Sequence, residues 1–522
     1  MQSKVSKAVL FMALFSLSAI TLAAAGPQVQ TNAGVVEGKE AGDVVAFLGI
    51  PYAAPPVGEL RWKPPVPAAK WAGVRKATDF GPHCMQGKVY DDMVFRDPGG
   101  SEDCLSLNIW RPAKPSKEKL PVMVWIYGGG FAAGTTSEQR QDGTYLSQQG
   151  VIVVSMNYRL GIFGFFVHPE LAKESGHNAA GNYGLLDQTA ALRWVHDNIA
   201  AFGGDPGNVT IFGESAGSFS VSAQMASPLA KGLFQKAIGE SGAAFYSEGM
   251  SFAPRPQREV DDVKAVSAKL GVSKLADLRA LPAQKILDAF GLEADGVFKF
   301  GPDVDGYFLP QSAPAIFAAG KQNDVPLLAG WNHDEGSYDV VSSPNKPTAT
   351  SVKADAHKDF GDKAAEFLKL YPAGSDPEAV RSNEDFAGDR FIAFSTWAWI
   401  EAQSKTGKQP IYRYRFDLAP PSDPKGPQLG AYHSADIEYV FGQLDSKAGM
   451  AWRAEDRELS ATMQKYWSNF AKSGDPNGPG LPKWPVYSHA DGWQVMYLSA
   501  KPAAGKDELR RRYLFLAGAW EK

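Results

Sequence analysis

The feature that most constrains the fold is a short β-rich segment that runs directly into a serine between two glycines. Residues 208–212 read Asn-Val-Thr-Ile-Phe, and Gly213 to Gly217 read Gly-Glu-Ser-Ala-Gly. β-branched and aromatic residues favour a strand, and Ser218 to Ser220 open a segment that we expect to be helical. A strand that turns into a helix at a serine strains that residue's backbone and exposes its hydroxyl. The segment therefore predicts a nucleophile at Ser215.

Glycines on both sides of this serine fit the same interpretation, because a side chain at either position would collide within the tight turn. A strand, a nucleophilic turn and a helix in this order are typical of an α/β-hydrolase. The rest of the chain agrees with a large enzyme. Its 522 residues are 44% hydrophobic and 21% charged, which is enough apolar material for a substantial core. No linker or repeat divides it, so we predict one catalytic domain over 26–522.

The first residues have the pattern of a secretory signal peptide. Lys4 and Lys7 precede an apolar run over 8–22, and three alanines then form a cleavage site before Gly26. The run is shorter than the ~20 residues that span a bilayer, so we expect no stable membrane anchor. We predict cleavage after residue 25 and a periplasmic or secreted protein. Without the two lysines the formal charge goes from −4 to −6, which argues against a nucleic-acid partner.

Only two cysteines are present, Cys84 and Cys104. Export to an oxidising compartment favours a disulfide between them, although two unpaired buried thiols remain the alternative. Closing a loop of this length is worth about 3 kcal/mol by chain entropy, and the closed loop could rim a site. With so few cysteines and no cluster of histidines, the sequence predicts neither a metal site nor another cofactor.

Strand and helix patterns alternate along the chain, which predicts a mostly parallel sheet with helices on both faces. The more polar segments near 246–300 and 340–430 are expected to be insertions that build a lid and a pocket. The expected strands are 122–127, 151–156, 236–240 and 325–331, the expected helices are 184–201 and 451–471, and a turn is expected at 205–207.

A serine nucleophile needs hydrogen-bond donors for the negative oxygen that develops during attack. The sequence Tyr-Gly-Gly-Gly-Phe at 127–131 follows a predicted buried strand, where a glycine-rich loop can present bare N–H groups. The alternatives are a flexible surface loop or a turn that leads into a helix. We expect a further donor in the N–H of Ala216, the residue after the nucleophile.

The serine also needs a base, which an acid must orient. In this fold the order along the chain is serine, acid, histidine, which leaves His357, His433 and His489 as candidates for the base. His357 lies in a charged helical pattern and His489 in a turn, whereas His433 lies in a loop ahead of an apolar stretch. Elimination favours His433 without deciding the matter.

The acid is expected on the loop after the strand at 325–329. Asp334 and Glu335 both stand there, and local reasoning does not choose between them. Asp303 and Asp305, in a Pro-Asp-Val-Asp-Gly turn, are further candidates, although acids in such turns are more often structural.

Longer motifs resemble those of the type-B carboxylesterase family from about 34 to 484. The segment 47–53 reads Phe-Leu-Gly-Ile-Pro-Tyr-Ala, and 202–217 fits the family's serine signature. The segment 102–110 resembles its second signature, except that Ser106 stands where an aromatic residue or threonine is usual. This departure touches no catalytic part.

The resemblance implies a serine carboxylic-ester hydrolase that forms an acyl-enzyme on Ser215, with a small-molecule ester as substrate. It assigns the acid to Glu335 and the base to His433, and it offers a family counterpart for the Cys84–Cys104 bridge. The implied oxyanion hole consists of Gly129, Gly130 and Ala216.

The sequence says less about which ester is cleaved. Residues 85–103 contain Tyr90 and Phe95 but no tryptophan, which argues against a quaternary ammonium substrate. A lipase or an amide-cleaving hydrolase could use the same triad, and a non-catalytic binding relative is a more distant alternative. The oligomeric state stays open. The aromatic candidates for a substrate pocket are Phe131, Phe219, Phe245 and Trp397.

Overall fold

A computed structural model describes residues 26–246, 252–291, 298–422 and 426–520. The predicted signal peptide, 1–25, lies outside the described residues. The centre of the described fold is an 11-stranded sheet in the order β18-β17-β16-β15-β12-β11-β9-β10-β8-β4-β3. From β17 to β10 all neighbours pair in parallel, and the pairs beyond them are antiparallel. Its strands are β3 (Lys39–Ala41), β4 (Val44–Pro51), β8 (Ser106–Pro112), β9 (Leu120–Ile126), β10 (Ile152–Met156), β11 (Gly204–Glu214), β12 (Lys236–Glu240), β15 (Leu327–Asn332), β16 (Ile411–Phe416), β17 (Gln494–Leu498) and β18 (Ala503–Lys506).

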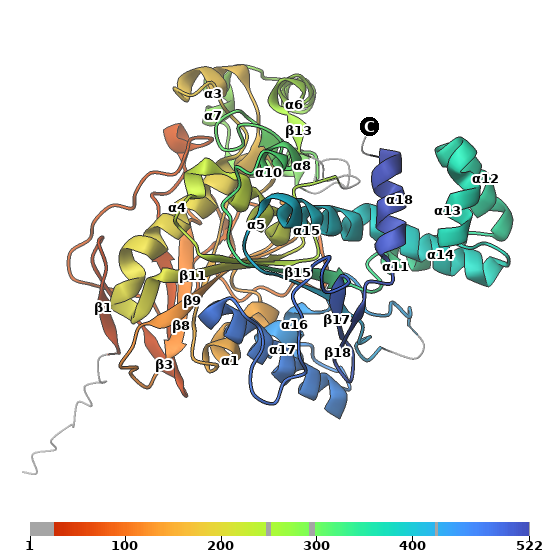
Figure 1. Ribbon diagram of the computed structural model, residues 1–522. Helices are drawn as coiled ribbons and strands as arrows, with labels where there is room; N and C mark the ends of the chain where they lie inside the picture. Colours follow the sequence, from red (N-terminus) through yellow and green to blue (C-terminus); the bar gives the residue numbers. More distant parts are fainter. Residues whose placement is uncertain (1–25, 247–251, 292–297, 423–425, 521–522) are drawn as a thin grey trace, which may run out of the picture.

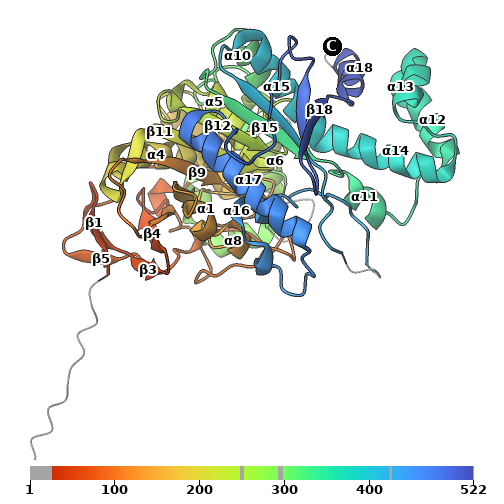
Figure 2. The same ribbon diagram turned by 60° about the horizontal axis from the view of Figure 1, so that its bottom comes forward.

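Helices cover both faces of this sheet (Figure 1). On one face lie α4 (Tyr183–Asn198), α5 (Ala216–Ala226) and α15 (Phe394–Thr406). On the other face α16 (Ile437–Phe441) packs against α17 (Ala454–Ser473), which crosses the strands in Figure 2. Strands β9 and β10 are mainly apolar because both of their faces are buried. This arrangement confirms the predicted mostly parallel sheet with helices on both faces.

Two predicted boundaries differ from the structure. The expected turn at 205–207 lies inside β11, where the register with β9 shifts between Gly204 and Val209, so the chain bulges without leaving the sheet. The range 340–430 also contains β16, a strand of the main sheet. The sequence did not indicate this strand because its arginines suggested a polar, exposed segment. In the fold, Arg413 is buried and pairs with Asp507.

The remaining elements surround this framework. Helices α12 to α14 extend from the sheet together with α18, on the right of Figure 1. Among the described residues, no helix is both long and apolar enough to cross a membrane. The other elements are β1 (Gln28–Gln30), β2 (Val35–Glu37), β5 (Val74–Lys76), β6 (His83–Cys84), β7 (Gly100–Ser101), β13 (Ala253–Pro254), β14 (Asp303–Val304), α1 (Thr144–Ser147), α2 (Gly161–Phe165), α3 (Pro169–Glu174), α6 (Arg255–Leu270), α7 (Leu275–Ala280), α8 (Ala283–Phe290), α10 (Ala313–Ala318), α11 (Ser337–Ser342), α12 (Ala349–Phe360), α13 (Ala364–Leu370), α14 (Asp376–Gly388), α18 (Arg510–Trp520) and the π-helical turn η6 (Asp389–Ala393).

Candidate active site

Ser215 occupies the turn between β11 and α5. Its backbone has φ 54° and ψ −124°, a conformation that costs free energy for a residue with a side chain. The Ser215 N–H donates to the carbonyl of Glu240 at 2.9 Å, which helps to hold the turn. A Cβ at Gly217 would overlap the carbonyl of Ile126 on β9. Glycine is therefore required where the helix passes close to the sheet.

His433 connects this serine to a carboxylate. Its Nε2 lies 2.9 Å from Ser215 Oγ, and its Nδ1 lies 2.5 Å from an oxygen of Glu335. The three side chains come from positions far apart in the sequence and form one continuous chain of hydrogen bonds. Such a chain can take a proton from the hydroxyl while the carboxylate stabilises the imidazolium that forms.

Glu335 is buried and fixed from two directions. Its second oxygen accepts hydrogen bonds from the hydroxyl of Ser241 at 2.6 Å and from the N–H of Asn332 at 2.8 Å. These bonds aim the other oxygen at His433. Ser241 is a residue that sequence reasoning missed, and its position directly after β12, which pairs with β11, was the available signal.

Asp334, the alternative acid, points elsewhere. Its carboxylate pairs with Arg381 at 2.6 Å and accepts the N–H of Ala431 at 2.8 Å. The Asp334 N–H donates in turn to the Ala431 carbonyl. Asp334 therefore ties the loop that carries the acid to the loop that carries His433, and to α14.

The other candidates lie apart from this hydrogen-bonded chain. Asp305 caps its own turn by accepting the N–H groups of Tyr307 and Leu309, and Asp303 is buried on β14. Among the histidines, His357 is exposed on α12 and His489 lies in an exposed turn.

The glycine-rich loop after β9 lies beside Ser215. A Cβ on Gly128 would lie 3.0 Å from the Ser215 Cβ. The next two residues, Gly129 and Gly130, have φ values of 101° and 64°, and their N–H groups donate to no acceptor in the described part of the chain. Ala216 is the first residue of α5, where an N–H has no partner within the helix. These three amides are therefore available to a negatively charged oxygen.

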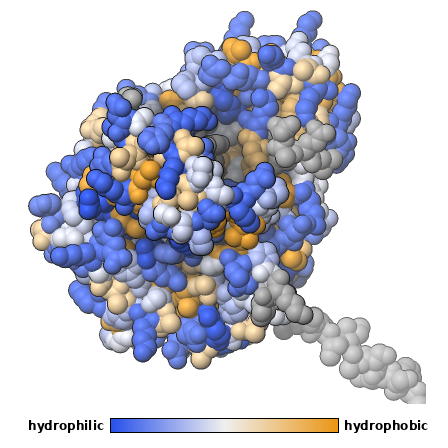
Figure 3. Space-filling view, turned by 90° about the vertical axis from the view of Figure 1, so that its right-hand side faces the viewer, coloured by the Kyte–Doolittle hydropathy of each residue, from blue (hydrophilic) through white to orange (hydrophobic). Residues whose placement is uncertain are grey.

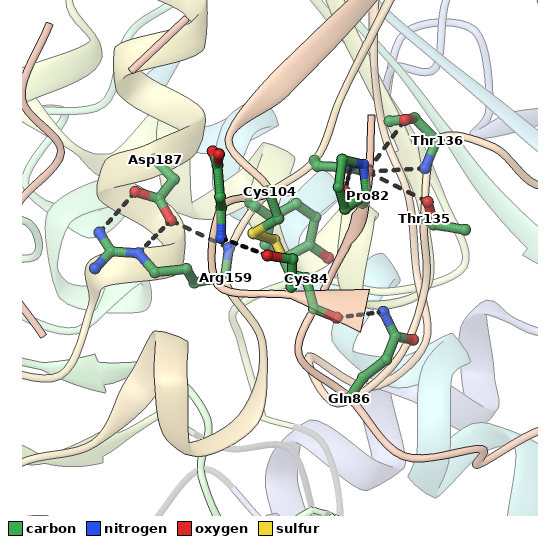
Figure 4. The surroundings of a disulfide bond; sticks show 12 residues. Pro82, Cys84, Gln86, Cys104, Thr135, Thr136, Arg159 and Asp187 are labelled. Atoms are coloured by element: carbon green, nitrogen blue, oxygen red, sulfur yellow. Dashed lines mark hydrogen bonds and ion pairs between the residues drawn. A yellow bond between two sulfur atoms is a disulfide. The ribbon is translucent and has the colours of Figure 1, made fainter. Parts of the chain in front are cut away.

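A disulfide between Cys84 and Cys104 closes the loop next to these glycines, with 5.0 Å between the two Cα atoms. Gln86 links the closed loop to the glycine-rich segment. Its amide nitrogen donates to the carbonyls of Cys84 and Gly134, and its oxygen accepts the Gly134 N–H at 2.8 Å. Figure 4 shows Gln86 beside the bridge. The disulfide loop is thus anchored directly to the candidate oxyanion loop.

Residues of the disulfide loop and of a distant segment cover the glycines. A Cβ on Gly130 would lie 2.6 Å from the ring of Phe298 and 3.6 Å from the hydroxyl of Tyr90. Met93 lies close to Gly129. Sequence reasoning mentioned Tyr90 only to show that residues 85–103 contain no tryptophan. It did not single out Phe298 or Met93.

The four pocket candidates divide into two groups. Phe131, at the end of the glycine-rich segment, and Phe219, in α5, both pack against Phe252, at ring distances of 6.2 and 6.5 Å. Phe245 packs instead against Phe317 at 5.4 Å. Trp397 lies against Phe394 and Tyr513 near α18.

Glu214 brings a second carboxylate to the site. One of its oxygens lies 3.4 Å from His433 Nε2. Burial raises the pKa of Glu214 to about 8, although the His433 cation opposes this shift. Burial lowers the pKa of His433, but the carboxylates of Glu214 and Glu335 outweigh that effect and raise the pKa to about 9.

The charges on Glu214 and His433 stabilise each other, so the pKa values of the two groups are linked. A quarter of the His433 side chain is open to solvent, which weakens the effect of both carboxylates on its pKa. Both carboxylates nevertheless favour the imidazolium. We therefore expect the pKa of His433 to lie above its ordinary value of about 6.5. Glu214 is within the serine motif, yet no pattern in the sequence indicated a role for its side chain.

One wall of the site was not foreseen. The ring of Phe391, in the π-helical turn η6, packs edge-on against the ring of His433 at 5.0 Å. Short π-helical turns often occur at functional sites. No group of three His, Cys, Asp or Glu side chains among the described residues could hold a metal ion.

Known proteins resemble this chain over nearly its whole length. The model of the carboxylesterase family matches residues 25–515. The chain is 37% identical to the fumonisin B1 esterase of Sphingopyxis macrogoltabida over 501 residues, which cover 91% of this chain and 87% of the relative. It is 38% identical to the para-nitrobenzyl esterase of Bacillus subtilis over 489 residues, which cover 91% and 95%.

A solved structure of a PNB esterase superposes with a TM-score of 0.80 at 37% identity, over 94% of this chain and 99% of that one. Both the sequence and the α/β-hydrolase architecture are therefore shared over nearly the whole length. The chain belongs to the carboxylesterase family and is a serine carboxylic-ester hydrolase.

Proposed function

We propose that Ser215 is the nucleophile, His433 the base and Glu335 the orienting acid of this esterase. The single observation that supports the proposal most strongly is the unbroken chain of hydrogen bonds from Ser215 Oγ through both His433 nitrogens to Glu335. Ser215 Oγ attacks the ester carbonyl carbon while its proton moves to His433 Nε2. The carbonyl π electrons move onto oxygen, which gives a tetrahedral oxyanion.

The N–H groups of Gly129, Gly130 and Ala216 would stabilise this oxyanion. Losing one donor of this kind costs about 100-fold or more in rate. As the tetrahedral species collapses, the carbon–oxygen bond to the alcohol breaks and His433 returns its proton to the leaving oxygen. Water then attacks the acyl-enzyme with His433 again as the base, which releases the acid and restores Ser215.

The substrate is proposed to be a small, soluble ester. Apolar rings lie close to the turn that carries Ser215, and Phe131 and Phe219 are the proposed substrate contacts among the four sequence candidates. Phe245 and Trp397 pack on other aromatic rings and are better explained as core. The printed names of two relatives, a fumonisin B1 esterase and a para-nitrobenzyl esterase, support an ester as the substrate.

We further propose that residues 26–522 form one catalytic domain and that the protein is periplasmic or secreted. The signal-peptide pattern over 1–25 and the cysteine bridge support this location.

The test is hydrolysis of para-nitrophenyl acetate, butyrate and octanoate by the wild type and by Ser215→Ala. We expect turnover of the soluble short esters without an oil interface, and its loss in the variant, with the fold checked by circular dichroism. Equal rates in the two proteins would reject Ser215 as the nucleophile. Activity only on emulsified esters would favour the lipase alternative.

A further inference from the structure

The loop that carries His433 is less buried than the turn that carries Ser215. Tyr432, His433 and Ser434 are all half-buried, whereas Ser215 is buried. The surface on the side of α12 to α14 is hollowed (Figure 3). On that side Phe391, whose ring packs against His433, also lines a cavity of about 430 Å³. Contacts on the opposite side of the loop are therefore needed to hold it in place.

The position of the His433 ring leaves little room for movement of this loop. Its two nitrogens lie 2.9 Å from Ser215 Oγ and 2.5 Å from a Glu335 oxygen. The next residue, Ser434, has a φ of 68°, a conformation that costs free energy for a residue with a side chain. The loop thus does not keep its shape by local preference alone. A misplacement of about 1 Å at a reacting group can cost about 100-fold in rate.

Lys447, directly after the short helical turn η7 (Leu444–Ser446), provides such a support. Its ammonium group donates a hydrogen bond to the hydroxyl of Tyr432 at 2.9 Å and lies 5.3 Å from the centre of the same ring. The ammonium also pairs with a carboxylate oxygen of Glu438, on α16, at 2.8 Å. Tyr432 directly precedes His433 in the chain. One cation therefore joins the residue next to the base to α16.

The backbone of Tyr432 is held as well. Its carbonyl accepts hydrogen bonds from the side-chain amide of Asn332 at 2.8 Å and from the N–H of Ala435 at 3.1 Å. Asn332 is the last residue of β15, the strand that leads into the acid loop. Tyr432 is thus fixed at its carbonyl to the acid side of the site and at its hydroxyl to Lys447. Because the two residues are adjacent, this also limits where His433 can lie.

The ion pair behind Tyr432 is largely removed from water. Only 1% of the Glu438 side chain and 23% of the Lys447 side chain are exposed. Burial lowers the pKa of Lys447, but the charge of Glu438 and the contact with Tyr432 outweigh this effect and raise it. Glu438 also interacts electrostatically with Glu138 and Arg140, which pair with each other at 2.5 Å. Lys447 is therefore a permanent cation bound between a buried carboxylate and the loop of the base.

On the basis of the proposed role of His433, we propose that Lys447 is a positioning residue for the base. Through Tyr432 it fixes the loop so that both ring nitrogens of His433 reach their partners. Lys447 contacts Tyr432 and Glu438, neither of which belongs to the hydrogen-bonded chain from Ser215 to Glu335. Its contribution is therefore to the rate of proton transfer and not to substrate binding.

The experiment measures kcat and KM on para-nitrophenyl butyrate, with the fold checked by circular dichroism. His433 acts in acylation and in deacylation, so kcat reports on its position whichever step limits the rate. Lys447→Met removes the ammonium group and keeps an apolar chain. Tyr432→Phe removes only one hydroxyl, and it tests the same contact if Lys447→Met does not fold. Lys236→Met is the matched control, because Lys236 is also buried and bonds Asn208, but at the start of β12.

Lys447→Met should lower kcat at least about 10-fold and change KM by less than about 2-fold, because the base is misplaced while substrate contacts remain. Tyr432→Phe should lower kcat in the same way but less. The double variant should lose no more than Lys447→Met alone, since both changes remove one contact. Lys236→Met should leave kcat unchanged. A wild-type kcat in Tyr432→Phe and in folded Lys447→Met, a rise in KM in place of the loss in kcat, or losses that multiply in the double variant would overturn the proposal.

His433→Ala separates this proposal from the proposed triad. If His433→Ala loses turnover while Lys447→Met and Tyr432→Phe keep the wild-type kcat, the triad stands and only the role of Lys447 is wrong. If His433→Ala keeps its turnover, His433 is not the base, and the role of Lys447 is rejected together with it.

Discussion

The two sides of the active site are built differently. On the nucleophile side, Ser215 and the glycine loop are attached to β9 and β11, two central strands that are buried over 122–126 and 209–214, where they lead into the site. On the helical side, His433 contacts Phe391, and the helices α11 and α14 are half-exposed around a cavity.

This difference suggests that the two sides of the active site have different roles. Close-packed strands hold backbone geometry within narrow limits, which a strained nucleophile and an oxyanion hole require. Half-buried helices tolerate changes of side chain at much lower cost. We therefore expect substitutions on the nucleophile side to alter chemistry or folding, and substitutions on the helical side to alter substrate preference.

The largest effect is expected where the two sides meet. Glu335→Gln keeps the shape of the acid but removes the charge that stabilises the imidazolium, so kcat should fall about 10⁴-fold. Asp334→Asn, the matched control on the neighbouring residue, leaves the Ser215–His433–Glu335 contacts in place and should lose much less activity. Steady-state kinetics on para-nitrophenyl butyrate measures both variants. The assignment of the acid is wrong if Asp334→Asn is the more damaging change.

A second prediction concerns the loop that covers the nucleophile side. Replacing Cys84 and Cys104 together by serine should lower the free energy of unfolding by about 3 kcal/mol, through the lost constraint on the unfolded chain. KM should rise as well, because the loop carries Tyr90 towards the glycines. Urea denaturation provides the measurement. Dithiothreitol should reproduce the loss in the wild type and have no effect on the double variant; an unchanged midpoint would contradict the expected role of the bridge.

A third prediction, of a smaller effect, concerns the contact between Phe391 and His433 on the helical side. Phe391→Leu removes the edge-on ring contact with His433 at 5.0 Å while keeping apolar bulk. Since an aromatic pair is worth about 0.5–1.5 kcal/mol, kcat/KM should fall by less than about 10-fold. A loss as large as that of Glu335→Gln would mean that Phe391 belongs to the chemical machinery.

The smallest expected effect is on pH dependence. The base must be neutral, so activity rises with pH through the pKa of His433, and the sequence alone places this limb near 6–7. The carboxylates of Glu214 and Glu335 raise that pKa, so the limb should lie above about 6.5. Glu214→Gln removes one of these charges and should move the limb of the kcat/KM profile to lower pH. A shift to higher pH would reject this electrostatic account.

The sequence predicted best what local pattern determines. The strand into Ser215 and the helix after it follow from β-branched residues and two glycines, and β12 has the predicted bounds, 236–240. Motif resemblance was needed to choose Glu335 over Asp334, since both follow the same strand and only the three-dimensional direction of each side chain separates them.

Other features depend on contacts between distant segments and left no local signal. Phe391 reaches His433 from a π-helical turn 42 residues earlier in the chain, and Ser241 reaches Glu335 from another strand end. Strand β16 was missed because its two arginines, at alternate positions, are typical of a polar insertion. In the fold, one of them, Arg413, pairs with the buried carboxylate of Asp507.

The most direct test of the central claim is to trap the covalent intermediate. Wild-type protein mixed with excess para-nitrophenyl butyrate, quenched in acid within the first turnovers and digested, should yield a butyrylated peptide containing Ser215 by mass spectrometry. Ser215→Ala should give no adduct on that peptide. A butyryl group on any other residue would contradict the account. So would turnover by the wild type without any adduct, under conditions in which deacylation limits the rate.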